Sequence, residues 1–127
     1  MNNTKKIVVF GGGGFLGSHV ADHLSKDGHI VTIFDINKSS FLKSNQKMII
    51  GDILDLDQVK KAVQGNDYVY HFAGLADINQ SKDEPIEAVK NNILGTTFIL
   101  EACKEYKIKR LVFASTIYVY SDLGSFY

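Results

Sequence analysis

The sequence has 127 residues, of which 45% are hydrophobic, so it can bury one sizeable core but not two. Its 14 basic residues balance its 14 acidic ones, which argues against a partner that is nucleic acid or an anionic membrane surface. The single cysteine, Cys103, excludes an intrachain disulfide, and no Cys/His cluster has metal-ligand spacing. Without a signal peptide or a long apolar run, we expect a soluble cytoplasmic protein with no metal site.

The first half of the chain predicts strands that alternate with helices. An apolar run at residues 5–10 predicts a strand, which stops at four glycines before a helix at residues 15–26. Short β-branched runs predict strands at residues 30–35 and 47–50, with a polar loop at residues 38–45 between them. This spacing is typical of βαβ units.

The second half continues the same alternation. Asp55 or Asp57 can cap a helix that runs to about Gln64, and a strand follows at residues 68–73. Residues 74–85 predict a functional loop with the only proline at its end. A long helix is expected at residues 86–106, and a fifth strand at 110–115. On the buried side of that helix we expect Val89, Ile93, Phe98 or Thr97, Leu100 and Ala102.

A parallel sheet follows from this order, because parallel neighbours need crossover connections that cover both faces. The strands are almost continuously hydrophobic, as strands buried on both faces should be. The predicted fold class is therefore α/β, with a doubly wound parallel sheet in three αβα layers that is truncated after about the fifth strand.

The four glycines carry the first functional signal. Gly11, Gly14 and Gly17 fit G-x-x-G-x-x-G, and they lie between a predicted strand and a predicted helix. Such glycines let bare backbone approach a pyrophosphate, and the amides at the helix N-terminus attract its charge. The alternative is a merely flexible turn. No Lys-Ser/Thr follows, so a nucleoside-triphosphate loop is disfavoured, and a Rossmann-type dinucleotide site is predicted.

Asp35 ends the second strand about 20 residues after the glycines. An acidic side chain there can accept hydrogen bonds from the ribose hydroxyls of NAD, and it would repel the 2′-phosphate of NADP. The alternative is a turn or cap residue. The positive charge of Lys38, three residues after Asp35, would favour the 2′-phosphate of NADP. No arginine lies beside Asp35, however, so NAD is the predicted cofactor.

Five segments in order resemble the extended short-chain dehydrogenase/reductases, the family of NAD-dependent epimerases and dehydratases of the UDP-galactose 4-epimerase type. The chain reads FGGGGFLGSHV where the family has TGGxGFIGSHL, and the later segments are GDIxD, HFAGL, NILGT and ASTIYVY. The resemblance covers nearly the whole chain. It implies that residues 1–127 are the N-terminal part of an NAD-binding domain, without the C-terminal substrate lobe.

The resemblance also implies a set of cofactor contacts. Asp52 and Ile53 would flank the adenine, the segment after His71 would line the ribose and diphosphate, and Asn92 would support the pocket. Ala76 stands where several epimerases carry a lysine, and His71 itself is expected to be a packed strand residue. The full predicted set is Gly11, Gly14, Phe15, Leu16, Gly17, Asp35, Ile36, Asp52, Ile53, Phe72, Ala73, Gly74, Leu75, Asn92, Ala114 and Ser115.

Two catalytic residues are implied in the same way. Thr116 occupies the family's catalytic Ser/Thr position, where the alternative is a simple strand-end hydroxyl. Tyr127 follows at about the separation of the family's catalytic tyrosine, and the lysine of Y-x-x-x-K would then come after the last residue. The alternative is that Tyr127 is an ordinary terminal residue.

The expected function of the complete protein is that of a homodimeric nucleotide-sugar epimerase or dehydratase, with a UDP-sugar as the substrate. The chain by itself is expected to be inactive. The alternatives are a noncatalytic NAD-binding or redox-sensing module, and a reductase of the same superfamily that acts on a non-sugar substrate.

Overall fold

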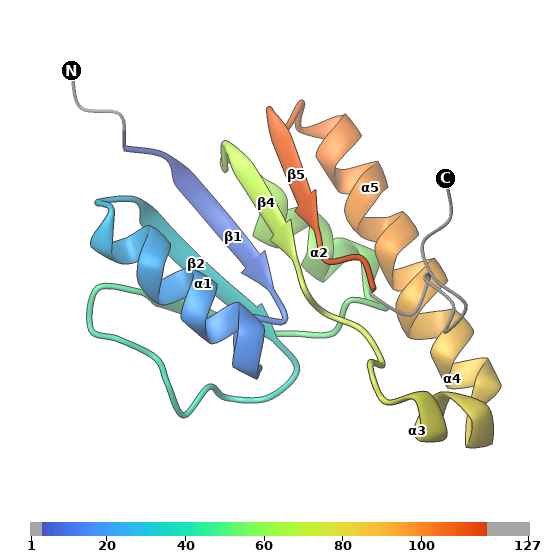
Figure 1. Cartoon of the computed structure of the whole chain (residues 1–127). Helices are drawn as coiled ribbons and strands as arrows, with labels where there is room; N and C mark the ends of the chain where they lie inside the picture. Colours follow the sequence, from blue (N-terminus) through green and yellow to red (C-terminus); the bar gives the residue numbers. More distant parts are fainter. Residues whose placement is uncertain (1–3, 117–127) are drawn as a thin grey trace, which may run out of the picture.

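Five parallel strands form the centre of the computed structural model, which describes residues 4–116 (Figure 1). Their order across the sheet is β3-β2-β1-β4-β5, and every neighbouring pair is parallel. All five predicted strands are confirmed, although β4 and β5 each end two residues early, where the chain turns into loops. The strands are β1 (Lys6–Phe10), β2 (Ile30–Asp35), β3 (Lys47–Ile50), β4 (Tyr68–His71) and β5 (Arg110–Phe113).

Helices cover both faces of this sheet, as the alternation of strands and helices predicted. Helix α1 (Phe15–Lys26) packs on one face, and α2 (Leu56–Val63) and α5 (Thr96–Glu105) pack on the other (Figure 1). Because side chains alternate along a strand, β1 sends Ile7 and Val9 to the α1 side and its other buried residues to the α2/α5 side. No helix in the described part of the chain is long and apolar enough to cross a membrane.

The loop predicted at residues 74–85 contains a short helix, α3 (Ile78–Asp83), that sequence reasoning did not foresee. Asp77 caps it, because its side chain accepts a hydrogen bond from the Gln80 amide at 2.8 Å. The Asp-x-x-Gln spacing of these two residues was an available signal for a helix start. Proline then stands in the first turn of α4 (Pro85–Val89), where its missing amide proton costs no helical bond.

The long helix expected at residues 86–106 is interrupted by a π-helical segment, η1 (Lys90–Gly95), between α4 and α5. The prediction of its buried side was largely wrong. Val89, Ile93 and Leu100 are 55%, 61% and 47% exposed, and Ala102 is the predicted residue that is fully buried. Gly95 and Ile99 are buried instead, Gly95 against Ile53 and Ile99 in the core cluster that includes β1 and β4 residues. This helix carries two apolar stripes, and periodicity alone does not reveal which one faces the sheet.

Candidate functional site

The candidate site is a cleft at the carboxyl ends of β1 and β4. The chain leaves β1 toward β2 on one side and returns to β4 on the other, so a crevice opens between the two strands. Two adjoining pockets of about 230 and 900 Å³ occupy this region. They share the walls formed by Gly11, Gly14 and the segment from Phe72 to Gly74.

The glycine turn is shaped by close backbone approaches. Gly11 has a positive φ of 74°, and a Cβ atom there would lie 2.5 Å from the Ala73 nitrogen. A Cβ atom on Gly17 would overlap the carbonyl oxygen of Gly11. Any other residue at these two positions would force the strand, the turn and the helix apart.

Helix α1 presents free backbone donors to the cleft. Gly14 is its N-cap and supplies no side-chain hydrogen bond, and the first turn of α1 contains no acidic residue. Gly14, Phe15, Leu16 and Gly17 all line the larger pocket. Unpaired amides and the positive end of the helix dipole suit this place to a phosphate group.

Asp35 stands at the end of β2, on the wall of the smaller pocket. Its Oδ2 accepts a hydrogen bond from the Gly13 amide at 3.0 Å, and its Oδ1 accepts one from the Asn37 amide at 3.1 Å. These two bonds fix the carboxylate against the glycine turn. Each carboxylate oxygen keeps a further lone pair that can accept a ribose hydroxyl.

Asp52 and Ile53 form the far wall of the smaller pocket. The Asp52 side chain turns back on its own backbone and accepts a hydrogen bond from the Leu54 amide at 2.9 Å. Asp52 therefore stabilises the turn after β3. Ile53 is 7% exposed and packs against Gly95, where an added Cβ atom would lie 2.6 Å from Ile53 Cδ1.

Two consecutive asparagines of η1 serve different pockets. Asn92, which the sequence predicted as a site residue, forms two hydrogen bonds with the loop after β4. Its Oδ1 accepts from the Leu75 amide at 2.7 Å, and its Nδ2 donates to the Leu75 carbonyl at 3.0 Å. Asn91, which sequence reasoning passed over, lines the smaller pocket, and its Nδ2 donates to the Glu87 carbonyl at 2.9 Å. The Asn-Asn pair was a signal, but its two members could not be told apart by pattern.

The segment after β5 forms one wall of the larger pocket. Ala114, Ser115 and Thr116 line it, and Thr116 is exposed. Tyr127, the other predicted catalytic residue, lies outside the described residues. The pocket wall also includes Thr96 and Phe113, which were not predicted as site residues, and Ile78, Ser81 and Lys82 of α3, which lie within the functional loop predicted at residues 74–85.

His71 is a buried strand residue, as expected. It is 1% exposed, its Nε2 lies 2.8 Å from Thr96 Oγ1, and its Nδ1 has no partner among the described residues. Burial lowers the pKa of His71 from 6.5 to about 4, because the charged imidazolium loses its hydration. At neutral pH the ring is therefore uncharged.

The cleft thus gathers residues that are far apart in the sequence. Every residue predicted to contact the cofactor lines one of the two pockets, although the contacts themselves stay predictions. Residues 4–116 contain no group of three or more His, Cys, Asp or Glu side chains that could hold a metal ion. An anion site at a helix N-terminus, a carboxylate at the end of β2 and a slot between them define a dinucleotide-binding Rossmann domain.

Comparison with known proteins identifies the family. The model of the NAD dependent epimerase/dehydratase family matches residues 7–126, and the chain belongs to this family. UDP-N-acetyl-alpha-D-glucosaminuronate decarboxylase of Bacillus cytotoxicus is 38% identical over 91% of the chain and 38% of its own length. UDP-glucose 4-epimerase of Neisseria meningitidis serogroup C is 36% identical over 94% of the chain and 39% of its own length.

Solved structures agree with this assignment. UDP-N-acetylglucosamine 4-epimerase of Methanobrevibacter ruminantium superposes with a TM-score of 0.85 at 37% identity, over 94% of this chain and 40% of that one. UDP-glucose 4-epimerase of Thermus thermophilus, in complex with NAD, gives 0.82 at 32% identity, over 87% of this chain and 37% of that one. The chain therefore spans well under half the length of these relatives. The predictions of the family and of the Rossmann fold are confirmed, and the family is one of NAD-dependent enzymes.

The buried histidine makes stability depend on pH. Because the pKa of His71 is about 4 in the folded state and about 6.5 when unfolded, the unfolded chain binds more protons between these values. The difference in the pKa of His71 contributes about 3 kcal/mol at most to the free energy of unfolding. This contribution is present above pH 6.5 and is lost as the pH falls toward 4. Urea unfolding of a His71→Asn variant should show a shallower loss of unfolding free energy over this range than the unsubstituted chain.

The exposed His23 of α1 provides the control, since His23→Asn should keep the original pH dependence. If His71→Asn and the unsubstituted chain lost stability in parallel between pH 6.5 and 4, burial of a neutral His71 would be the wrong explanation.

Proposed function

We propose that this chain binds NAD and forms the cofactor half of a nucleotide-sugar epimerase or dehydratase. The observation that carries the proposal is the joint position of the α1 N-terminus and Asp35 on the walls of two connected pockets. The first suits a diphosphate and the second suits an adenosine ribose. The relatives named above, whose names include UDP-glucose, UDP-N-acetylglucosamine and UDP-N-acetyl-alpha-D-glucosaminuronate, support a nucleotide-sugar substrate, and in particular a UDP-sugar.

NAD would supply the hydride acceptor and donor in this reaction. The protein would contribute position and proton transfer. Thr116 faces the larger pocket, where its hydroxyl can hydrogen-bond a substrate oxygen. Tyr127 would remove the hydroxyl proton of the sugar as hydride leaves the same carbon, and return of the hydride to the opposite face would complete an epimerisation.

Two other functions remain distinct candidates. A noncatalytic NAD-binding or redox-sensing module would bind NAD through the same residues and would not need Tyr127. A reductase of the same superfamily would keep the chemistry and accept a non-sugar substrate. The family membership favours the epimerase or dehydratase, because its relatives named above act on nucleotide-sugars.

We also propose a homodimer for the complete protein, with a second copy packed on the exposed stripe of α4, η1 and α5. Ile86, Val89, Ile93 and Leu100 follow one another at helical spacing and are 47–70% exposed. Glu87 and Lys90 form an ion pair beside the stripe, so two copies related by a two-fold axis could exchange opposite charges across it. An apolar stripe beside a pair of opposite charges suits an isologous contact, in which the same surface of both copies meets.

Cofactor choice can be measured on the chain itself. Calorimetric titration should show tighter binding of NAD than of NADP, because the Asp35 carboxylate faces the ribose and repels a 2′-phosphate. Asp35→Asn should weaken NAD binding by roughly 10-fold or more, since hydrogen bonds to a charged acceptor contribute about 1.5–3 kcal/mol. Asp27→Asn, at the opposite end of α1, should leave the affinity unchanged. A preference for NADP would contradict the proposed role of Asp35.

Catalytic roles require the full-length protein. Tyr127→Phe should reduce turnover of the nucleotide-sugar by at least about 100-fold, the usual contribution of a general acid–base group, with little change in NAD affinity. Thr116→Val should also slow turnover, whereas Thr116→Ser should preserve it because the hydroxyl remains. Normal turnover by Tyr127→Phe would eliminate that residue as the proton-transfer group.

The proposed dimer can be disrupted at its apolar stripe. Ile93→Glu should convert the full-length protein from dimer to monomer in sedimentation velocity, because two buried carboxylates would face each other near the two-fold axis. The control is Ile30→Glu, an exposed isoleucine at the start of β2. A dimer that survives Ile93→Glu, or an unsubstituted protein that is monomeric, would show that this stripe is not the interface.

A further inference from the structure

The connection from β2 to β3 is a parallel crossover without a helix. Residues 36–46 run from the cleft at the end of β2 back to the opposite edge of the sheet, where β3 begins, and they pass beside α1 (Figure 1). Nearly all of them are exposed, and only Ser39 and Gln46 are buried. A loop of this kind has no helical hydrogen bonds of its own, so these two side chains must account for much of its order.

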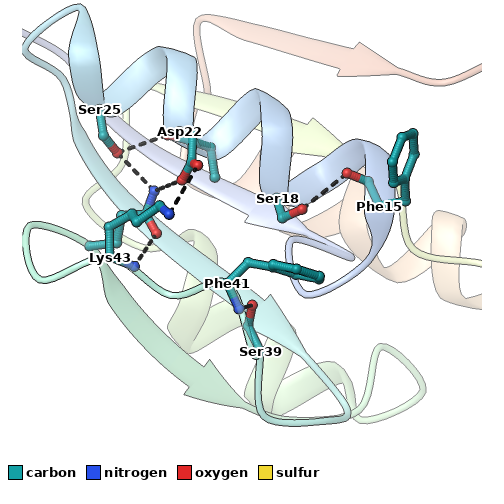
Figure 2. Close-up of polar contacts among 9 residues, drawn as sticks. Phe15, Ser18, Asp22, Ser25, Ser39, Phe41 and Lys43 are labelled. Atoms are coloured by element: carbon teal, nitrogen blue, oxygen red, sulfur yellow. Dashed lines mark hydrogen bonds and ion pairs between the residues drawn. The ribbon is translucent and has the colours of Figure 1, made fainter.

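Gln46 fastens the far end of this crossover to α1. Its Nε2 donates to Asp22 Oδ1 at 3.0 Å and to Ser25 Oγ at 3.2 Å, and its Oε1 accepts from the Lys43 amide at 3.0 Å. Lys43 Nζ also lies 3.8 Å from Asp22 Oδ2. Figure 2 shows the Asp22, Ser25 and Lys43 side chains turned toward one another between α1 and the loop. The Gln46 residue is 8% exposed, and both hydrogens and the oxygen of its side-chain amide are bonded.

Ser39 fastens the crossover nearer to the cleft. Its Oγ accepts a hydrogen bond from the Phe41 amide at 3.1 Å, and its own amide donates to Met48 Sδ at 3.3 Å. The crossover begins at Ile36, which lines the smaller pocket, and Asn37 donates to Asp35. One continuous segment therefore joins the wall of the proposed adenosine site to the Gln46 contacts.

The helix at the other end of those contacts also belongs to the cofactor site. The N-terminus of α1 lines the larger pocket, and Asp22 and Ser25 stand later on the same helix. Gln46 thus joins the far end of the crossover that begins at the smaller pocket to the helix whose N-terminus lines the larger pocket. If this tie were lost, the crossover would sample other positions, and the apparent dissociation constant would rise by the inverse of the competent fraction.

We propose that Gln46, through Asp22 and Ser25 of α1, is a positioning residue that sets the affinity for the adenosine half of NAD. The inference rests on the proposed binding of NAD. Gln46 touches no part of the proposed ligand site, and it acts by keeping residues 36–46 in the arrangement that completes the smaller pocket.

The test compares three changes to the Gln46 contacts. Gln46→Leu removes the amide at similar volume, and Asp22→Ala removes one acceptor with a substitution that helices tolerate well. The double variant Asp22→Asn with Gln46→Glu keeps the net charge, because one carboxylate is lost and another is gained. It also reverses the hydrogen bond between these two positions, since an amide on α1 can then donate to a carboxylate on the crossover. Calorimetric titration with NAD, ADP-ribose and nicotinamide mononucleotide measures binding, and thermal unfolding measures stability.

The matched control is Asn66→Leu. The Asn66 Nδ2 donates to the Ala62 carbonyl at 2.8 Å, at the end of α2 and away from both pockets. This variant should lower stability without altering the affinity for NAD. It therefore separates loss of a structural amide from loss of the proposed positioning role.

We expect Gln46→Leu to raise the dissociation constants of NAD and ADP-ribose about 3- to 10-fold and to leave nicotinamide mononucleotide unaffected. Asp22→Ala should act in the same direction, and the exchanged pair should recover to within about twofold of the unsubstituted chain. Unchanged ADP-ribose binding in Asp22→Ala and Gln46→Leu, or an equal loss in Asn66→Leu, would overturn the inference. Failure of the unsubstituted chain to bind NAD would instead refute the proposed function.

Discussion

The close approach of the glycine turn to the end of β4 is the constraint on which the cofactor cleft depends. Gly11 lies so near the backbone of Phe72 and Ala73 that a single Cβ atom would not fit, and Gly17 is equally close to Gly11. The glycine turn between β1 and α1 therefore packs against the end of β4 through backbone atoms, with no side chain between them. As a result, Gly11 and the segment from Phe72 to Gly74 line both pockets, and the N-terminus of α1 lines the larger pocket beside them.

Asp35 extends this arrangement to the ribose side of the cleft. It accepts hydrogen bonds from the amides of Gly13 and Asn37, so one carboxylate holds the turn before α1 and the start of the crossover after β2. The crossover would otherwise be poorly fixed, because it replaces the usual helix by exposed loop. Buried Gln46 and the α1 residues that it contacts hold its other end. The hydrogen bonds of Asp35 at one end of the crossover and of Gln46 at its other end thus connect the proposed ribose site to the ordering of this loop.

The π-helical segment η1 is one feature of the site that the sequence did not predict. It brings Gly95 against Ile53, and its two asparagines line different pockets. π-Helical turns are rare and often occur at functional sites. Here the segment also leaves an apolar stripe around Ile93 pointing away from the sheet, where it is available to a partner.

The sequence by itself determined the five strands, the glycine turn, Asp35 at a strand end and Thr116 after the last strand. These follow from local chemistry, because strand propensity, glycine conformation and motif spacing act within a few residues. Only the tertiary structure decided which stripe of the long helix is buried, that Asn92 grips Leu75 while Asn91 lines the smaller pocket, and that Gln46 reaches α1. Each of these depends on contacts between residues distant in sequence, which no periodicity records.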